Sequence, residues 1–318
     1  MIDLTPMSAA EARHLRDLAE VWKTYGPALR AKLALDGGMT WKTVNGGEYL
    51  CRYRQDPDTG KKKFTSLGRR SAETEATYRD FIGRRDAARQ TVLAGRDDIA
   101  LAGRIAKAHG LARMPAKHAE ILRAFWRASL DRHLTLCSGA ALFAYEVKTE
   151  ILTPPALTHD DKLLFLFDGS DECTDEDIVD AYEDATGAKV VADRGKDRLR
   201  IQADRCVGVE IASYKSLLRQ VDDDDQVDVL REAFELPVVR GLTVARDTQL
   251  VEITAPDPRT FALLAYVLGR KDELWAERAR FTAALVRERW PDKFDPRNES
   301  EFPEICVDPD DRQRFYRP

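Results

Sequence analysis

The sequence predicts an α+β protein, and three shifts in its hydrophobic pattern support this class. Residues 1–133 predict a helical region, because apolar residues recur at helical spacing except between 39 and 70, where they alternate as in a small antiparallel sheet. Residues 134–255 alternate short apolar strands with helices, which is typical of an α/β unit on a mixed sheet. Residues 256–318 return to a helical pattern and predict a C-terminal helical region with a tail.

The N-terminal region begins with a predicted helix over its first thirty residues. Three short strands are predicted next, at 41–44, 48–54 and 61–67, separated by a glycine-containing turn and a polar loop. Because a small sheet needs a covering layer, we expect the long helix that Ser71 caps to pack on it. Further helices are predicted at 98–109 and 116–130.

The middle region carries the alternating pattern of the mixed sheet. A helix is expected to begin after Thr174, whose hydroxyl can cap it with Asp177 three residues later, and to end at Gly187. Another helix is predicted at 140–148, and the C-terminal helical pattern continues through Trp290. Strands are predicted at 134–137, 162–167, 189–192, 199–203, 207–212, 242–245 and 249–254.

The composition predicts a folded protein without a membrane anchor. At 318 residues the chain is long enough for two domains and has ample apolar content for a core. No apolar run approaches the roughly 20 residues of a membrane span, and the start lacks the features of a signal peptide, so the cytoplasm is the expected compartment. Five scattered cysteines predict reduced thiols rather than a disulfide framework or a zinc site.

Charge is distributed unevenly along the chain. Residues 1–133 hold 25 Lys and Arg against 16 Asp and Glu, whereas the remaining residues hold 25 against 39. A basic N-terminal half can attract nucleic acid or a phosphorylated partner, and an acidic half that binds a metal tolerates its own negative charge. The alternative is a pair of solvated helix faces.

One stretch of the middle region carries residues suited to phosphate chemistry. Ser138, Gly139 and Ala140 form a turn of small residues that opens a helix, where free backbone N–H groups can hold a phosphate. Asp160 and Asp161 form an acidic cluster at the entrance to a strand, where carboxylates can hold Mg²⁺. Carboxylates two residues apart on a strand point to the same face and can share one metal ion.

A third carboxylate is expected from a neighbouring strand. Glu210 lies within the apolar segment 207–212, where a charged side chain is costly unless it faces a partner or a cleft. It could act as a base on an attacking hydroxyl. The structural alternative is an edge-strand glutamate paired with an arginine.

Three separated segments together resemble a known family. They read Trp41-Lys42, Gly47-Glu48-Tyr49-Leu50 and Ser66-Leu67-Gly68 in the N-terminal sheet, Gly139-Ala140-Ala141-Leu142-Phe143-Ala144-Tyr145-Glu146 in the middle region, and Pro256-Asp257-Pro258-Arg259-Thr260-Phe261-Ala262-Leu263 in the C-terminal region. In order and spacing the chain resembles the bacterial nucleotidyltransferase-fold family, which joins an N-terminal helical and β region to a minimal polymerase-β-like transferase domain.

The resemblance implies a polymerase-β-like core in residues 134–255 and Mg²⁺-dependent transfer of a nucleotidyl group from an NTP to an RNA, protein or small-molecule acceptor. Metal binding and catalysis are implied for three carboxylates, Asp160, Asp161 and Glu210. Nucleotide binding is implied for Ser138, Gly139, Ala140, Lys162 and Arg259.

The chain departs from the family pattern at the metal site. The pattern Thr-x-Asp-x-Asp corresponds to Thr158-His159-Asp160-Asp161-Lys162, so Lys162 stands where the second carboxylate is expected. Its ammonium group is expected to pair with Asp160 and to repel an incoming cation. Asp161 can substitute only if the strand bulges, so that its side chain turns inward.

The phosphate-binding positions also differ from the pattern. Ala140 replaces a threonine, and the helix after Arg259 lacks a His-Lys pair suited to a phosphate tail, for which Arg259, Arg270 or Lys271 could substitute. Two functions therefore stay open. One is a nucleotidyltransferase with a partly degenerate metal site; the other is a catalytically inactive nucleotidyltransferase-like binding or regulatory module, for example in a toxin–antitoxin or phage-defence system.

Overall fold

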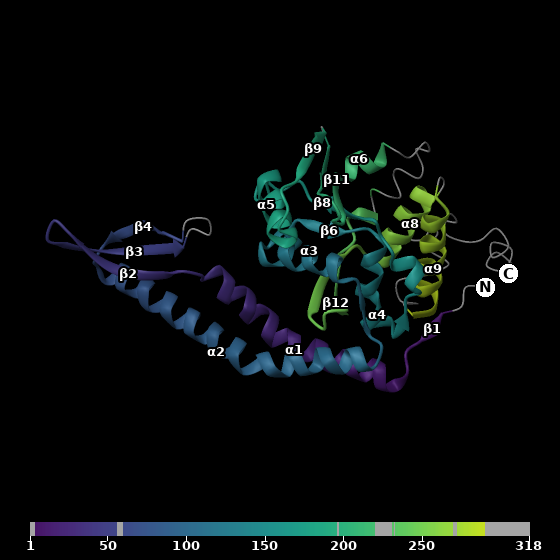
Figure 1. The fold of residues 1–318 in the computed structure, drawn as a ribbon, viewed down its shortest axis with the longest axis horizontal. Coiled ribbons are helices and arrows are strands. Elements are labelled where there is room, and N and C mark those ends of the chain that lie inside the picture. Colours follow the sequence, from purple (N-terminus) through teal and green to yellow (C-terminus); the bar gives the residue numbers. More distant parts are fainter. Residues whose placement is uncertain are drawn as a thin grey trace. The chain divides into compact units, whose positions relative to one another are not determined.

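The computed structural model describes residues 4–55, 60–195, 197–219, 231, 233–269 and 272–289 (Figure 1). The chain folds as two compact units: residues 17–102 form the first, called the arm unit, and residues up to Arg16 together with those from Gly103 onward form the second, called the core unit. Mixed helices and strands, with mixed sheets, confirm the predicted α+β class. The predicted domain boundaries, at residues 133 and 255, divide the chain differently from these two units. The predicted domains stay a prediction.

The arm unit is built from two helices and one sheet. Its elements are α1 (Ala9–Ala34, from Asp17 onward), β2 (Gly38–Val44), β3 (Gly47–Gln55), β4 (Lys62–Arg69) and α2 (Ala72–Ala108, as far as Ala102). The strands pair antiparallel in the order β2-β3-β4, which confirms the predicted small sheet. Residues 56–59 of the predicted polar loop lie outside the described residues.

Helix α2 covers one face of this sheet, as predicted. The rings of Trp41 and Tyr78 lie 6.0 Å apart, and the Arg52 guanidinium lies 5.5 Å from the centre of the Phe81 ring. Leu50, in the central strand, is fully buried. These contacts join the sheet and the helix into one small core.

The length of α2 corrects the predicted helix pattern, because the segment predicted as a separate helix at 98–109 belongs to this helix, which ends at Ala108. Gly95 does not interrupt it. A Cβ at this position would lie 2.9 Å from the Tyr25 ring of α1, so the glycine allows the two helices to approach closely.

The core unit contains a five-stranded mixed sheet in the order β6-β8-β11-β10-β9. Strands β8 and β11 run parallel, and the other neighbours pair antiparallel. The strands are β6 (Leu134–Leu136), β8 (Lys162–Phe167), β9 (Val191–Gly195), β10 (Arg198–Gln202) and β11 (Gly208–Ser213). All five segments were predicted as strands, with ends that differ by a few residues.

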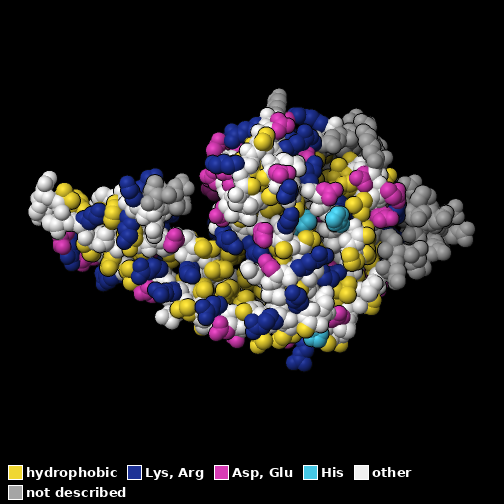
Figure 2. Space-filling model, viewed as in Figure 1, with side chains coloured by type: hydrophobic (Ala, Val, Ile, Leu, Met, Phe, Trp, Pro, Cys, Tyr) yellow, Lys and Arg dark blue, Asp and Glu magenta, His cyan; other side chains and the backbone are white. Residues whose placement is uncertain are grey.

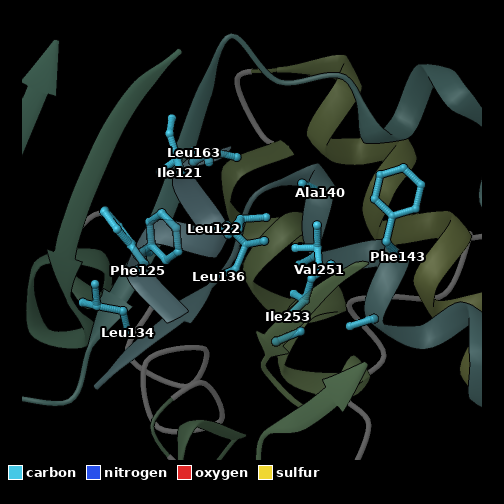
Figure 3. Close-up of a cluster of buried hydrophobic side chains, with 14 of the residues drawn as sticks. Ile121, Leu122, Phe125, Leu134, Leu136, Ala140, Phe143, Leu163, Val251 and Ile253 are labelled. Atoms are coloured by element: carbon cyan, nitrogen blue, oxygen red, sulfur yellow. The ribbon is translucent and has the colours of Figure 1, made fainter. Parts of the chain in front are cut away.

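Side chains of β8 alternate between two apolar layers. Leu163 and Phe165 belong to the main core cluster, which α3 (Ala116–Arg127) completes. Leu164 and Leu166 point to the other face, where they cluster with Leu264 of α8 (Pro258–Gly269). The apolar stripe of α3 is therefore core, as predicted. Figure 3 shows part of the first layer, with Ile121, Leu122, Phe125, Leu134, Leu136 and Leu163.

Two smaller sheets complete the core unit. One has the order β13-β12-β5, and the other pairs β1 with β7. Their strands are β5 (Ala112–Met114), β12 (Val239–Ala245), β13 (Leu250–Ala255), β1 (Thr5–Pro6) and β7 (Ile151–Leu152). The hairpin of β12 and β13 was predicted; β1, β5 and β7 were not, because two or three residues are too few to show a period.

The remaining helices of the core unit are short, apart from α5 and α9. They are η1 (Leu130–Arg132), η2 (Gly139–Leu142), α4 (Phe143–Thr149), η3 (Pro155–Thr158), α5 (Asp175–Thr186), α6 (Tyr214–Leu218) and α9 (Glu273–Arg289). Helix α5 has the predicted capping box of Thr174 and Asp177 and ends at Gly187, whose φ is 64°. Arg270, Lys271 and Trp290 lie outside the described residues. None of the helices described has both the length and the apolar content to cross a bilayer.

Candidate functional site

The predicted phosphate turn connects β6 to η2 and is buried. Ser138 takes the cap position before Gly139, with an extended backbone, yet its hydroxyl makes no cap hydrogen bond. The side chain is 1% exposed, and its Oγ has no hydrogen-bond partner within the described part of the chain. The two residues that follow, Gly139 and Ala140, are buried as well.

The carboxylate of Asp160 accepts hydrogen bonds from the backbone amide groups of this turn. The N–H groups of Gly139 and Ala140 donate to its two oxygens, at N···O distances of 3.1 and 2.8 Å. Asp160 follows η3 and lies two residues before the start of β8. A carboxylate is favourable at the N-terminus of a helix, so Asp160 performs the capping role that Ser138 leaves open.

The charge of Asp160 is neutralised by Arg278 of α9. The guanidinium Nη2 lies 2.7 Å from Asp160 Oδ1 and also donates to the His159 carbonyl at 2.8 Å. Its Nε donates to the Leu157 carbonyl at 2.9 Å, and the ring of Trp275 lies 4.6 Å from the guanidinium carbon. The side chains of Arg278 and Asp160 are 2% and 4% exposed, so the ion pair is enclosed within the protein.

Gly139 is required by this packing. A Cβ built on it would lie 2.2 Å from the Leu157 carbonyl oxygen and 2.3 Å from Arg278 Nη2, which is far inside contact distance. The glycine of the predicted phosphate turn therefore has a structural reason: it lets the guanidinium lie against the backbone.

His118 of α3 adds a further contact to the Asp160 segment. Its Nε2 lies 2.9 Å from the Asp160 carbonyl oxygen, and the residue is 4% exposed. Burial lowers the pKa of His118, although the hydrogen bond and nearby charge of Asp160 oppose this shift. A neutral ring then donates its Nε2–H to the carbonyl.

Asp161 lies in different surroundings from Asp160. Its side chain is fully exposed, with one carboxylate oxygen 3.6 Å from His159 Nε2. The β8 strand begins after it, at Lys162, and its carbonyl accepts a hydrogen bond from the Gly208 N–H at 3.4 Å. The inward turn that a substitute metal ligand would require is not observed.

Lys162 pairs with Glu210, not with Asp160 as expected. Its Nζ contacts Glu210 Oε2. Arg198 approaches Glu210 Oε1 at 3.0 Å, and Arg200 approaches Oε2 at 3.6 Å. Burial raises the pKa of Glu210, but hydrogen bonding and charge from Lys162, aided by the two arginines, outweigh it and hold the pKa below its usual value.

Arg259 is held by its neighbour in the chain. Its Nε donates to Asp257 Oδ1 at 3.0 Å, and its backbone N–H donates to the same oxygen at 3.0 Å. Asp257 is fully buried, and the Arg259 side chain is 12% exposed. In this arrangement Arg259 compensates a buried carboxylate at the start of α8.

Within the core unit, the structure thus brings together some of the predicted residues and separates others. Asp160 meets the turn at Gly139, and Lys162 meets Glu210, whereas Asp161 points into solvent. Among the residues described, no three His, Cys, Asp or Glu side chains form a group that could hold a metal ion. The catalytic and binding roles of these residues stay predictions.

Sequence reasoning missed Arg278 and His118, although the sequence carries a signal for the arginine. Arg278 lies three residues after the partly buried Trp275 and four before the buried Thr282, on the apolar-facing stripe of α9. An arginine on a buried stripe indicates an internal anion that it must neutralise.

Comparisons with protein-family models, with curated proteins and with solved structures each found no match.

Proposed function

We propose that this chain is a nucleotidyltransferase-like binding module whose core does not transfer nucleotides. The observation that carries the proposal is the enclosure of Asp160 by two backbone N–H groups and the guanidinium of Arg278. The resemblance to nucleotidyltransferases is supported by the position of the Gly139 turn after β6 and of Asp160 before β8, because these two strands are neighbours in the sheet.

Metal binding at Asp160 would require this enclosure to open. Mg²⁺ needs near-octahedral oxygen ligands and keeps several of its waters, whereas the Asp160 side chain is 4% exposed. Releasing Arg278 would leave a buried charge without a partner, which costs about 3–5 kcal/mol. The three cations around Glu210 oppose a divalent cation there by like-charge repulsion.

The partner we propose for this module is nucleic acid, attracted by the basic N-terminal half of the chain. Residues 1–133 carry the excess of Lys and Arg, and phosphate contacts supply most sequence-independent affinity for nucleic acids. The core would then act as a folded scaffold, not as a source of nucleotidyl groups.

A second candidate is Mg²⁺-dependent transfer of a nucleotidyl group from an NTP to an acceptor. It is favoured by Ser138, whose buried hydroxyl has no partner among the described residues. Asp160, Asp161 and Glu210 would hold the metal in this candidate, after Asp161 had turned inward and after Asp160 and Glu210 had released the cations that now pair with them.

A label-transfer assay separates the two candidates. The full-length protein is incubated with Mg²⁺ or Mn²⁺ and each of the four radiolabelled NTPs, with total cellular RNA and protein as acceptors. We expect no incorporation above that of heat-denatured protein. Metal-dependent incorporation that Asp161→Asn abolishes would contradict the proposal.

The variant Lys162→Asp is the matched control for this assay, because it restores the Asp-x-Asp pattern and leaves Arg278 in place. We expect it to remain without transfer, since Asp160 is still held by the guanidinium. Incorporation of nucleotide by Lys162→Asp would show that Lys162 alone prevents nucleotidyl transfer.

A further inference from the structure

The pairing register of the arm sheet assigns its side chains to two faces. Trp41 lies opposite Leu50, and Met39 lies opposite Arg52, and directly opposed residues share a face. These side chains lie on the face that α2 covers, where Trp41 meets Tyr78. The alternate residues of each strand therefore point away from α2.

This other face, called the open face, combines aromatic and basic side chains. Its strand residues are Thr40, Lys42, Tyr49, Cys51, Tyr53, Gln55, Lys62, Phe64, Ser66 and Arg69. Three of them are aromatic and three are basic, and none of these ten is acidic. Figure 2 shows Lys and Arg side chains interspersed with hydrophobic ones over this unit.

Contacts between side chains confirm that these residues share the face. The rings of Tyr53 and Phe64, on adjacent strands, have centres 5.6 Å apart. Lys42 Nζ lies 3.0 Å from the centre of the Phe64 ring, and Lys62 Nζ lies 4.6 Å from the centre of the Tyr53 ring. Phe64 is 42% exposed, which is unusual for a phenylalanine in a strand.

Among the described residues of β2, β3 and β4, Glu48 is the acidic one, and its side chain points away from the open face. It precedes Tyr49 in β3, so its side chain points to the opposite side, where its carboxylate pairs with Arg70 at 2.7 Å. The open face therefore presents positive charge between aromatic rings without a neutralising carboxylate from the described strand residues.

We propose that the open face binds single-stranded nucleic acid, with bases stacked on Phe64 and Tyr53 and phosphates held by Lys42, Lys62 and Arg69. Exposed rings can stack on bases of any sequence, and nearby cations track the backbone. The lysines that now lie over the rings would move to phosphates as bases replace them. This inference deepens the binding role proposed above and rests on it for the class of partner.

A single strand fits this surface better than a duplex or an acidic protein. A duplex buries the faces of its bases and presents mainly phosphates, so the exposed rings would have nothing to stack on. An acidic protein would use the lysines and the arginine but would have no need of an exposed Phe64 beside Tyr53.

Fluorescence anisotropy with the full-length protein tests the proposal. The probes are labelled oligo-dT and oligo-U of about 20 nucleotides, long enough to cover one binding face, and a duplex of equal length. We expect both single strands to bind more tightly than the duplex, with affinity that falls steeply between about 50 and 200 mM salt. Polyglutamate serves as the acidic-protein competitor.

Matched variants identify the surface. Phe64→Ala should weaken single-strand binding by about tenfold, and Phe64→Trp should preserve it, because stacking needs a ring and not a particular residue. Leu67→Ala is the control, since Leu67 is on the same strand and is also 42% exposed. Lys62→Gln should lower the salt dependence by about one phosphate contact, whereas Lys32→Gln on α1 should not.

Three outcomes would overturn the inference: equal affinity for duplex and single strand, no difference between Phe64→Ala and Leu67→Ala, or displacement by polyglutamate as efficient as by unlabelled oligonucleotide. Nucleotide incorporation in the label-transfer assay would instead overturn the proposed function of the core. The two failures are therefore distinguishable.

Discussion

The pairing of Asp160 with Arg278 is the residue-scale feature on which the account of the core depends. A buried carboxylate and a buried guanidinium each carry a large desolvation penalty, which their mutual attraction and hydrogen bonds offset. Asp160 accepts two backbone N–H groups and one guanidinium N–H, and Arg278 donates to two carbonyls besides. Removing one partner therefore leaves the other charge buried without a counter-charge.

We predict that Arg278→Met lowers the free energy of unfolding by about 3–5 kcal/mol, because Asp160 then remains buried without its cation. Urea unfolding measures the change. Arg280→Met is the matched control: Arg280 lies on the same helix in an exposed pair with Glu273, and its loss should cost less than about 1 kcal/mol.

A double variant separates loss of charge pairing from loss of packing. Asp160→Asn in the Arg278→Met background removes the carboxylate that lacks a cation. The double variant should therefore lose less free energy of unfolding than the two single variants lose in sum. Strict additivity would contradict the ion pair as the source of the destabilisation.

At the scale of elements, the charged cluster around Glu210 joins three strands of the core sheet. Lys162 comes from β8, Arg198 and Arg200 come from β10, and Glu210 lies between them on β11. These four residues lie on the sheet face that also carries Leu164, because Glu210 is opposite Leu164 and Arg200. The cluster therefore links three neighbouring strands of the sheet through ion pairs.

The depressed pKa of Glu210 predicts a pH dependence of stability. Its folded-state pKa lies below the usual 4.5, so the stabilisation is fully present above that value and is lost as the pH falls through the folded pKa. The stability difference between the native protein and Glu210→Gln should accordingly shrink below about pH 4.5 in urea unfolding. Glu288→Gln, at an exposed position on α9, should show no such trend.

Regular elements could be predicted where a pattern repeats within one segment. Strand β8 has apolar residues on both faces and α5 has a local capping box, so both follow from neighbouring residues. Helix α2 was predicted as two helices, and only the position of Tyr25 shows why a glycine is favourable at position 95 within it. Contacts between helices cannot be predicted from the residue pattern within one segment.

The site was less predictable than the fold. Glu210 was singled out as a charge within an apolar strand, and Asp160 and Lys162 through the family pattern, but the residues that pair with them were not identified. Arg278 is 118 residues from Asp160 in the chain, and Lys162 is 48 residues from Glu210. Pairings over such separations depend on how the elements pack, which hydrophobic periodicity does not specify.

At the scale of the whole molecule, we propose a different role for each of the two units. The core unit encloses the carboxylates of Asp160 and Glu210, and the arm unit presents an open sheet face with aromatic and basic side chains. A nucleic-acid partner would then be held by the arm unit while the core remains a scaffold. The two roles are tested separately: metal-dependent nucleotide binding tests the core unit, and binding of single-stranded nucleic acid tests the arm unit.

The most direct test of the enclosed Asp160 is calorimetric titration of the full-length protein with Mg²⁺ and each of the four NTPs, in the presence and absence of chelator. The account predicts no metal-dependent binding of any nucleotide, because the carboxylate and the amide groups of the turn already satisfy one another. Micromolar binding of an NTP that chelator removes and that Asp160→Asn abolishes would contradict it.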